Sequence, residues 1–475
     1  MAFLERNANR GSVSTGYDID NSVKLQTAGV NSEFFNKSYS STGNRETWTF
    51  STWVKRTEIG SNNYLLDAYK NSNTWFILGF SDVDDIVLYD IIAGTDYGKR
   101  TTAVYRDTSA WYHIVFVSDT TNGTAGDRQR LYVNGVRVTD FDSDYGDPPS
   151  GYDGSVNDAI VHSIGYRTDG NSSFNGYLAE TILVDGTALD PTDFGEFDSN
   201  SGIWKPIEIT DTSFTWGTNG LWLKYDNAAS MGANSAGTGG FSVQNVNQND
   251  QATDTPTNNF CIGNALVNFA PGGQTLVRGA TKFSNPSGQN WQTITGTFGL
   301  TSGKWYWEFE TDGTGAFVGI SDVEDSIVPQ RTDGYFLGYG DDNSATTKSL
   351  GMYSTNGVIY NDSGSATGTS YGSGNRVGVA LDMDNRKIYF AVDNNWANSG
   401  DPANGTNGAT WNTSWSDTVF PAGSCAQNNS IFFVYGGFSS LSNISNVDAN
   451  GYGGFYYTPP SGFYALCTKN LAEYG

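Results

Sequence analysis

The sequence predicts an all-β fold with at least two β-sandwich domains. The chain has 475 residues, which is too long for a single hydrophobic core. Aromatic residues make up 14% of it, and 58 glycines stand against only 4 methionines, a composition typical of short strands joined by tight turns. Segments that alternate between polar and apolar residues recur along most of the chain, separated by Gly, Asn and Asp.

The first domain follows a polar N-terminal region. Residues 1–40 are rich in Gly, Ser and Asn and weakly periodic, which predicts an arm that is disordered or is ordered by a neighbouring molecule. Residues 41–205 are then expected to form the first sandwich, with short alternating segments from Trp48 onwards. Within it, Asn134-Gly135 predicts a type I′ hairpin turn, because both central residues of that turn need positive φ.

The second domain is separated from the first by a region of different character. Residues 206–275 contain few apolar residues and many turn formers, which predicts a connector. Two short aromatic segments in it, residues 214–216 and 221–225, are candidates for extra strands of the first sandwich. Residues 276–440 form a second series of strands, and residues 441–475 are expected to form a C-terminal tail.

The charge and the cysteine content narrow the partners that the chain can have. Fifty acidic residues against 26 basic ones give a formal net charge of −24, which repels phosphate backbones and anionic lipid headgroups. We therefore expect neither nucleic acid nor membrane insertion. Three widely spaced cysteines favour folding in a reducing cytoplasm over a disulfide framework. No stretch approaches the roughly 20 apolar residues of a membrane span, and no export signal is recognised at the N-terminus.

Several segments of the first domain together carry a family pattern. They are residues 48–55, Trp111-Tyr112-His113, residues 131–135, residues 174–186 and residues 193–196. This set resembles the laminin-G-like family of concanavalin-like proteins. The resemblance implies a jelly-roll β-sandwich for residues 41–205.

The second domain carries another such pattern. Its segments are residues 303–308, 317–320, 338–340 and 377–396. They resemble a SPRY domain, which implies a second concanavalin-like jelly-roll sandwich that binds protein segments through its loops and is not an enzyme.

The order of the two modules gives a third resemblance. With residues 254–260 between them and residues 458–467 and 470–471 after them, they resemble structural proteins of marine and aquatic tailed phages. This implies a virion protein made in the host cytoplasm: a tail fibre, spike or similar appendage that contacts a host-surface glycan or protein through loop residues. It also implies docking to other virion proteins through the arm, and assembly as a homotrimer. The alternative is a head-decoration or tail-assembly protein that binds virion proteins without contacting the receptor.

We expect no enzymatic activity. The closely spaced carboxylate pair that retaining glycoside hydrolysis needs is not evident. The nearest candidates, Glu308, Glu310 and Asp312, alternate along one strand and would share one face. The two histidines, His113 and His162, are expected to be packed and hydrogen-bonded rather than to act as bases. The alternative is an enzyme that depolymerises surface polysaccharide.

Clusters of aspartate in turns are candidate calcium sites. Laminin-G-like domains often hold Ca²⁺ at a loop edge, and carboxylate oxygens are ligands that this ion prefers. One cluster is Asp82, Asp84 and Asp85, and another is Asp142, Asp144 and Asp147. The alternative is that these side chains hydrogen-bond their own backbone, as aspartate in turns commonly does. No other cofactor is expected.

Glycan binding would need an exposed aromatic ring that stacks on sugar CH groups, bordered by amides or carboxylates that bind the hydroxyls. Aromatic and amide residues of the expected loops supply the candidates. They are Tyr145, Tyr152, Tyr166, Tyr335, Tyr371 and Trp396, with Asn394 and Asn395 next to the last of these. The alternative for each aromatic residue is packing within a core or between domains.

Overall fold

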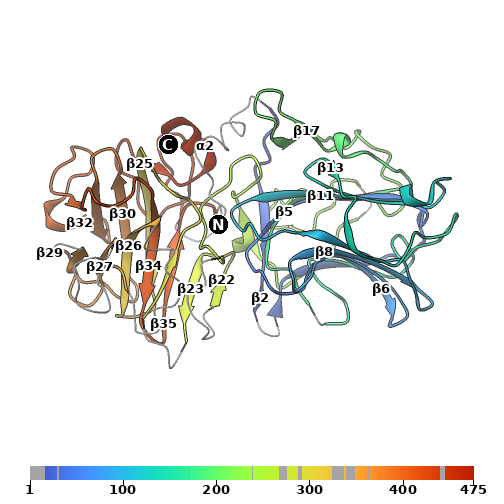
Figure 1. Cartoon of the computed structure of the whole chain (residues 1–475), viewed down its shortest axis with the longest axis horizontal. Helices are drawn as coiled ribbons and strands as arrows, with labels where there is room; N and C mark the ends of the chain where they lie inside the picture. The colour runs from blue at the N-terminus through green and yellow to red at the C-terminus, as the bar shows by residue number, and fades with distance from the viewer. Residues whose placement is uncertain are drawn as a thin grey trace. The chain divides into compact units, whose positions relative to one another are not determined.

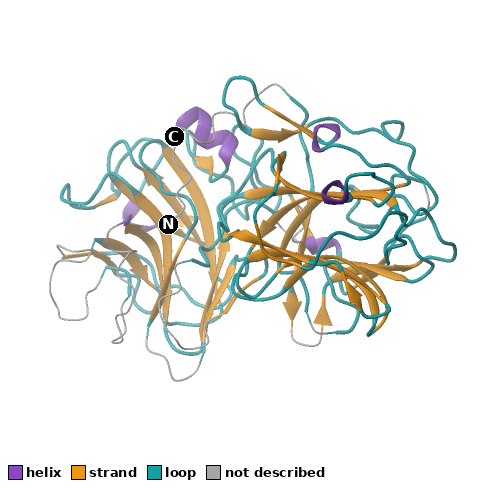
Figure 2. Ribbon diagram, turned by 45° about the vertical axis from the view of Figure 1, so that its right-hand side comes forward, coloured by secondary structure: helices purple, strands orange, loops and turns teal. Residues whose placement is uncertain are grey.

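The computed structural model describes residues 16–28, 31–170, 172–237, 239–266, 275–286, 291–323, 336–338, 348–361, 364–438 and 444–475. Two compact units, Ser14–Thr257 and Asn258–Gly475, are distinguished, and we call them the N-terminal and the C-terminal unit. The regular secondary structure of both is almost entirely strand, joined by many loops (Figure 2). The prediction of an all-β chain with two sandwiches in tandem is confirmed. Within the described ranges, no helix has the length and apolar character of a membrane span.

The N-terminal unit is a sandwich of two antiparallel sheets. The first sheet has eight strands, in the order β13 (Val136–Arg137), β12 (Gln129–Val133), β11 (Trp111–Asp119), β5 (Thr47–Arg56), β16 (Gly176–Asp185), β1 (Ser22–Leu25) and β21 (Gln251–Ala252), with β19 (Leu221–Leu223) paired to β16. The second has nine, in the order β14 (Phe141–Asp144), β10 (Lys99–Val104), β8 (Asp85–Ile92), β7 (Thr74–Phe80), β6 (Asn63–Asn71), β15 (Val161–Ile164), β4 (Phe34–Ser38) and β20 (Ser242–Gln244), with β9 (Thr95–Asp96) paired to β8.

Large apolar side chains hold these two sheets together. Figure 1 shows β5 and β11 in one layer and β6 and β8 in the other. Phe50 of β5, Phe116 of β11 and Phe76 of β7 are buried in the shared core. Successive side chains of a strand point to opposite faces, so alternate residues from one face of each sheet supply this core.

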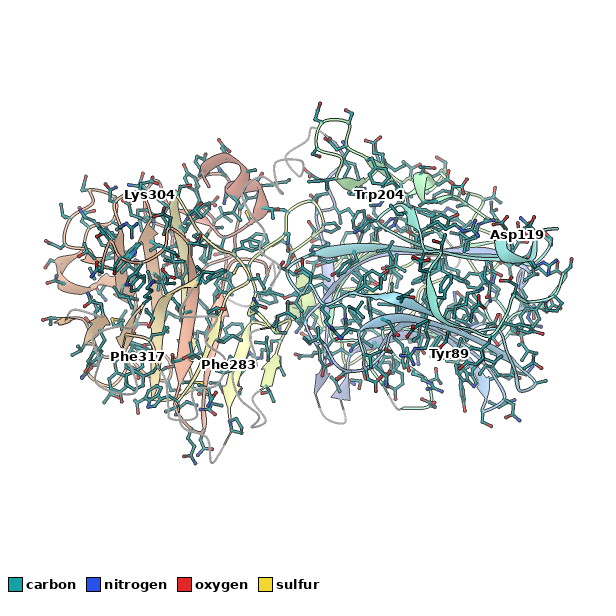
Figure 3. All side chains as sticks on the ribbon, in the orientation of Figure 1. Tyr89, Asp119, Trp204, Phe283, Lys304 and Phe317 are labelled. Atoms are coloured by element: carbon teal, nitrogen blue, oxygen red, sulfur yellow. The ribbon has the colours of Figure 1, made fainter. Side chains whose placement is uncertain are left out.

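The outer face of the eight-stranded sheet is covered by the chain that follows β16. Val115 and Val117 of β11 pack there against Trp216 and Trp222, whose rings stack with centroids 5.7 Å apart. The same segment contains the small sheet of β17 (Gly195–Phe197) and β18 (Trp204–Pro206). Trp204, labelled in Figure 3, packs against Trp53 of this face. The outer face of the eight-stranded sheet is therefore buried by this segment.

Parts of the expected arm and connector belong to this sandwich. β1 and β4 lie within residues 1–40, and β19, β20 and β21 lie within residues 206–275. β1 pairs with both β16 and β21, and Ser22 is the register partner of Ala252. Lys24 of β1 also forms a buried ion pair with Asp250 over 2.6 Å. Contacts with segments far away in the sequence therefore make polar stretches into strands of the sandwich, although these stretches have little strand character of their own. Residues 1–15 of the expected arm are outside the described residues.

The hairpin at Asn134-Gly135 is confirmed. Val133 pairs with Val136, and the two residues between them have φ values of 49° and 76°. Both values lie in the left-handed region that a type I′ turn needs. A Cβ on Gly135 would also overlap the ring of Trp204, so the turn leaves no room for a larger residue.

The C-terminal unit is a second sandwich. One sheet has nine strands, in the order β22 (Thr275–Val277), β23 (Lys282–Asn285), β35 (Asn429–Val434), β25 (Lys304–Thr311), β30 (Arg376–Asp382), β31 (Lys387–Val392) and β32 (Asn395–Trp396), with β33 (Ala409–Thr410) paired to β31 and β36 (Tyr464–Ala465) paired to β25. The other has six, in the order β24 (Gln292–Thr295), β34 (Val419–Cys425), β26 (Ala316–Asp322), β27 (Ser349–Tyr353), β28 (Ile359–Asn361) and β29 (Gly364–Ala366). Trp305, Trp307 and Phe309 of β25 lie in the core between them.

The expected C-terminal tail packs on this sandwich where it is described. Glu308 of β25 accepts hydrogen bonds from the backbone N–H groups of Tyr456 and Tyr457, over 2.8 and 2.9 Å. Phe455 and Phe463 join a cluster with Tyr306. The segment ends in helix α2 (Thr468–Tyr474).

The remaining short elements lie in the connections. They are the hairpin strands β2 (Thr27–Ala28) and β3 (Asn31–Ser32) and the 3₁₀ turns η2 (Ala125–Asp127), η3 (Pro191–Asp193), η4 (Gln248–Asp250) and η5 (Ala397–Ser399). The three cysteines are buried.

Candidate functional site

A polar cleft of about 570 Å³ lies beside the ends of strands β5, β6, β7 and β16 of the N-terminal unit. Its lining comes from the hairpin β2–β3, the loop after β5, the turn after β7 and the loop before β16. The lining residues are Thr27, Ser32, Glu58, Gly60, Ser61, Asn62, Asp82, Gly170, Ser172, Ser173 and Asn175. A volume of this size is typical of a small-molecule site.

Asn175 fastens two walls of the cleft to each other. Its side-chain oxygen accepts a hydrogen bond from the backbone N–H of Thr27 over 2.6 Å, and its side-chain amide donates to Glu58. Its own backbone N–H donates to the side chain of Asn63 over 2.8 Å. One amide therefore sets the positions of the β2–β3 hairpin and of the loop after β5.

The buried carboxylate of Asp84 holds the loop after β5 in place. Gly60, at φ +71°, donates its N–H to Asp84 over 2.7 Å. Asp84 also accepts from Arg56 and Arg106, each over 2.9 Å. Burial by itself raises the pKa of Asp84, but the Gly60 N–H and the two guanidinium groups outweigh it and hold this pKa below its usual value. The charged form of Asp84 therefore keeps the loop in place.

The cleft offers hydrogen-bonding groups and a negative charge. Asn62 and Asp82 are exposed, and their side chains make no hydrogen bond with any described residue. Glu58 adds a second carboxylate, whose Oε1 accepts from Ser61 over 3.1 Å. Within the described part of the chain, no lysine, arginine or aromatic side chain lines the cleft. The site is therefore suited to a ligand with many hydroxyl groups and no negative charge.

Comparison with family models assigns both units. Residues 31–193 match the concanavalin A-like lectin/glucanases superfamily, and residues 304–438 match the SPRY domain. The chain carries a concanavalin A-like domain followed by a SPRY domain. Both expectations about the domain families are confirmed, and we use these names for the two units below.

Three solved structures illustrate what the chain is similar to. The SPRY domain of human HERC1 is 18% identical, with 34% of this chain and 91% of that chain covered and a TM-score of 0.25. A heptameric SAP-like pentraxin from Limulus polyphemus is 15% identical, with 37% and 80% covered and a TM-score of 0.28. A candidate carbohydrate-binding protein from Bacteroides ovatus is 17% identical, with 48% and 60% covered and a TM-score of 0.31. No curated protein matches the sequence.

Three of the predicted site residues lie at or beside the cleft, and one is Asp84, which holds Gly60 of the lining as described. Asp82 lines it directly. Tyr166 lies next to it, because its hydroxyl is 3.3 Å from the position that a Cβ on Gly170 would take. The ring of Tyr166 stacks on Phe34 with centroids 4.1 Å apart. Tyr145 is 56% exposed on the same domain, away from the cleft lining and 6.3 Å from the ring of Tyr89.

Tyr371 is not the exposed loop residue that the sequence suggested. Its side chain is 4% exposed and belongs to the core of the SPRY domain. Its hydroxyl donates to the backbone oxygens of Met352, over 2.7 Å, and Ala316, over 3.2 Å. Both polar and apolar parts of the ring are therefore used in packing. Tyr335 lies outside the described residues.

The remaining predicted ligand residues form a turn of the SPRY domain. Asn394, with φ 64°, lies in the turn between β31 and β32, and Asn395 donates to the backbone oxygen of Asp393 over 3.1 Å. Trp396 is half-buried against a cluster that contains Tyr389. The structure places these three residues on a different domain from the cleft and gives Asn394 and Asn395 a role in turn geometry.

Residues of both aspartate clusters form ion pairs with basic side chains. Asp84 contacts Arg56 and Arg106 as described, and Asp85 contacts Arg100 over 2.9 Å. In the second cluster, Lys99 reaches both Asp144 and Asp147, over 3.1 and 2.9 Å. Asp84 and Asp85 therefore contact arginines in this structure, and calcium binding at either cluster stays a prediction. Across the described ranges, no three His, Cys, Asp or Glu side chains gather as a metal site requires.

The candidate acids and bases lie in packed surroundings. Glu308 is fully buried, Glu310 pairs with Arg376 over 3.1 Å, and Asp312 accepts from the Ser430 N–H, so the three do not share an open face. His113 and His162 are buried and hydrogen-bonded, as predicted. They are held by Trp204 Nε1 and by the Asn157 N–H respectively, over 2.9 and 3.0 Å.

The residues that shape the cleft were missed from the sequence. Asn175, Glu58 and Asn62 lie in loops of ordinary polar composition. Their association depends on hydrogen bonds between residues more than a hundred positions apart, such as Asn175 and Thr27. The one local signal is the sequence Gly60-Ser-Asn62 directly after a strand, which many turns share.

Proposed function

We propose that this chain is a non-enzymatic binding protein whose concanavalin A-like domain holds a neutral glycan in the polar cleft. The observation that carries the proposal is the lining itself: exposed Asn62 and Asp82, the hydroxyls of Ser61 and Ser172, and no basic side chain among the described lining residues. Sugar hydroxyls both donate and accept hydrogen bonds, so amide, carboxylate and hydroxyl groups match them. Two carboxylates disfavour sulfated or acidic sugars.

The fixed geometry of the walls supports binding. Asn175 and Asp84 hold the loop after β5 through hydrogen bonds to Glu58 and to the Gly60 N–H. A site whose groups are already in place loses less freedom when a ligand binds. Asp82 and Asn62 therefore present free polar groups from positions that their neighbours set.

The test is a glycan array probed with the labelled full-length chain, with neutral and acidic glycans side by side. We expect binding to neutral glycans, and a loss of about tenfold or more in Asp82→Asn, because a lost charge-assisted hydrogen bond costs about 1.5–3 kcal/mol. Asp211→Asn is the matched control, since Asp211 is exposed on the same domain and does not line the cleft. Binding to acidic glycans alone, or equal binding by the parent and Asp82→Asn, would contradict the proposal.

We further propose that the binding serves a phage virion appendage, such as a tail fibre or spike, that contacts the host surface. The sequence resemblance to tailed-phage structural proteins supports this role, together with the pairing of two binding folds in one chain. Homotrimer assembly and docking through the N-terminal residues are parts of the same proposal. The alternative is a head-decoration or tail-assembly protein that contacts virion proteins only.

Labelling separates these two roles. Antibodies against the chain should label the tail or its appendages on purified particles, and the labelled protein should bind host cells in a way that periodate oxidation of surface glycans abolishes. Labelling of the head without cell binding would favour the alternative. Particles that carry no label would contradict both roles.

A further inference from the structure

The outer face of the nine-stranded sheet carries a row of aromatic side chains. In β7, Phe76 and Leu78 point into the core, so Trp75 and Ile77 point outwards. Ile77 is the register partner of Tyr89 in β8, which therefore shares the outer face. Tyr89 is labelled in Figure 3, on the lower layer of this domain. Trp75 and Tyr89 pack on this face against the cluster of Tyr64, Ile77 and Val87.

Three of these rings follow one another across the strands. The centroids of Trp75 and Tyr89 are 6.1 Å apart, and those of Tyr89 and Tyr145 are 6.3 Å apart. Trp75 and Tyr89 are half-buried, whereas Tyr145, directly after β14, is 56% exposed. We call Trp75, Tyr89 and Tyr145 the aromatic strip.

The strip is connected to the cleft by Arg167. Its guanidinium lies 4.7 Å from the ring of Trp75 and 5.8 Å from the ring of Tyr64. Arg167 also accepts, through its backbone oxygen, the N–H of Gly170, which lines the cleft. Tyr64 follows two residues after Asn62, another lining residue. Arg167 therefore contacts both a ring of the strip and a residue that lines the cleft.

Two arginines near the cleft and the strip are each paired with an aspartate. Arg167 contacts Asp169 over 2.9 Å, and Arg100, on the same outer face, contacts Asp85 over 2.9 Å. Such pairs leave no excess charge to attract an anionic chain. Aromatic rings beside neutralised polar groups match the apolar and hydroxyl-bearing faces of a sugar.

We propose that the aromatic strip is a second subsite, which binds further sugar units of the same neutral glycan that the cleft holds. The ligand is then an extended oligosaccharide or polysaccharide chain rather than a single sugar. This inference rests on the proposed function of the cleft. It goes beyond it, because it assigns the recognition of chain length to Trp75, Tyr89 and Tyr145.

Chain length is the variable that tests it. The probes are gluco- and manno-oligosaccharides of one to six units, of the linkage selected by the array, titrated calorimetrically against the full-length chain. We expect the affinity of the parent to rise about tenfold or more between two and six units. In Tyr145→Ala, the hexamer should lose about three- to tenfold in affinity while the disaccharide keeps its affinity, since one stacked ring is removed.

Two further variants make the outcomes distinct. Asp82→Asn should weaken all chain lengths alike, because it acts in the cleft. Phe197→Ala is the matched control, since Phe197 is 51% exposed on the same domain and is not part of the strip. Two outcomes would contradict a second subsite while leaving the proposed function of the cleft intact. In the first, the hexamer binds no better than a disaccharide. In the second, Asp82→Asn weakens hexamer binding and Tyr145→Ala does not. Absence of binding by every neutral probe would overturn the proposed function itself.

Discussion

Trp204 donates its indole N–H to Nδ1 of His113 over 2.9 Å, and Ser51 lies 2.8 Å from Nε2 of the same ring. An indole can only donate, so Nδ1 carries no proton and the proton of the neutral ring lies on Nε2, facing Ser51. Burial lowers the pKa of His113 to about 3, so the ring is neutral near neutral pH. Trp204 belongs to the segment that covers the eight-stranded sheet, and His113 belongs to that sheet. The hydrogen bond between Trp204 and His113 therefore joins the covering segment to the eight-stranded sheet.

Replacing His113 should weaken the attachment of the covering segment to the sheet and lower the stability of the domain. His113→Ala leaves the Trp204 N–H without an acceptor and creates a cavity, so we expect a loss of about 3 kcal/mol in the free energy of unfolding. Urea unfolding of the concanavalin A-like domain measures it. Glu196→Ala, in the same covering segment, is the control and should cost under about 1 kcal/mol, because its contact with Lys205 is largely exposed. Equal losses in the two variants would show that the hydrogen bond to Trp204 contributes little.

Gly135 is expected to tolerate no side chain. It lies at φ +76°, and a Cβ would overlap the Trp204 ring, so Gly135→Ala combines backbone strain with a steric clash. We expect a loss of about 3 kcal/mol or more in thermal unfolding. Gly94→Ala is the matched control, because Gly94 has φ +82° and open space around it. It should lose only about 1–2 kcal/mol, the cost of the left-handed backbone for a non-glycine residue. Similar losses at both sites would exclude the clash.

The buried ion pair of Lys55 and Asp254 should be intolerant of losing one partner. Their charged atoms are 2.6 Å apart, and both side chains are at most 1% exposed. Lys55→Met leaves the Asp254 charge uncompensated, so we expect a loss of about 3–5 kcal/mol. The double variant with Asp254→Asn should lose clearly less than the sum of the two single variants. Lys70→Met is the control, since Lys70 meets Asp158 at the surface over 3.6 Å. Additive losses in the double variant would refute the coupling.

The stability of the SPRY domain should fall as the pH rises towards 8. Burial raises the pKa of Glu308 to about 7, against the opposing effect of the Tyr456 and Tyr457 N–H groups. A folded-state pKa above the unfolded value of about 4.3 means that folding favours the protonated form. The stabilisation is complete below pH 4.3 and is lost as the pH rises through 7. Urea midpoints between pH 5 and pH 8 should show this decline.

Glu308→Gln should flatten that pH dependence, because glutamine cannot ionise. Glu473→Gln is the control, since it removes an exposed carboxylate from α2 of the same domain and should keep the slope. A Glu308→Gln variant with the slope of the parent would place the titrating group elsewhere.

The strands of both sandwiches were predictable because their pattern is local. Aromatic and β-branched residues are concentrated in β11, and aromatic residues occupy alternate positions of β25. The hairpin at Asn134-Gly135 follows from the φ values that two residues must take. β1 has no comparable signal. It is a strand because β16 and β21, far away in the sequence, provide its hydrogen-bond partners.

The candidate site was predictable only in part, for the same reason. Tyr145 and Tyr371 each precede a glycine in a polar loop, and their local sequences give no basis for telling them apart. One is 56% exposed and the other 4%, because the backbone oxygens of Met352 and Ala316 hold the second ring inside a sandwich. In the same way, Asp82 and Asp84 are two residues apart. The fold brings Arg56 and Arg106 into contact with Asp84, whereas Asp82 lines the cleft.

The pairing of β1 with β21 has a mechanical consequence. Ser22 and Ala252 are register partners, so the chain enters and leaves the concanavalin A-like domain at neighbouring points of one sheet. A pulling force applied through these two points would stretch the hydrogen bonds between β1 and β21 one after another, because it acts across the strands rather than along them. The domain should therefore unzip from its own ends at low force, and optical-tweezer extension from Ser22 and Ala252 would record this as a gradual release before the sandwich opens.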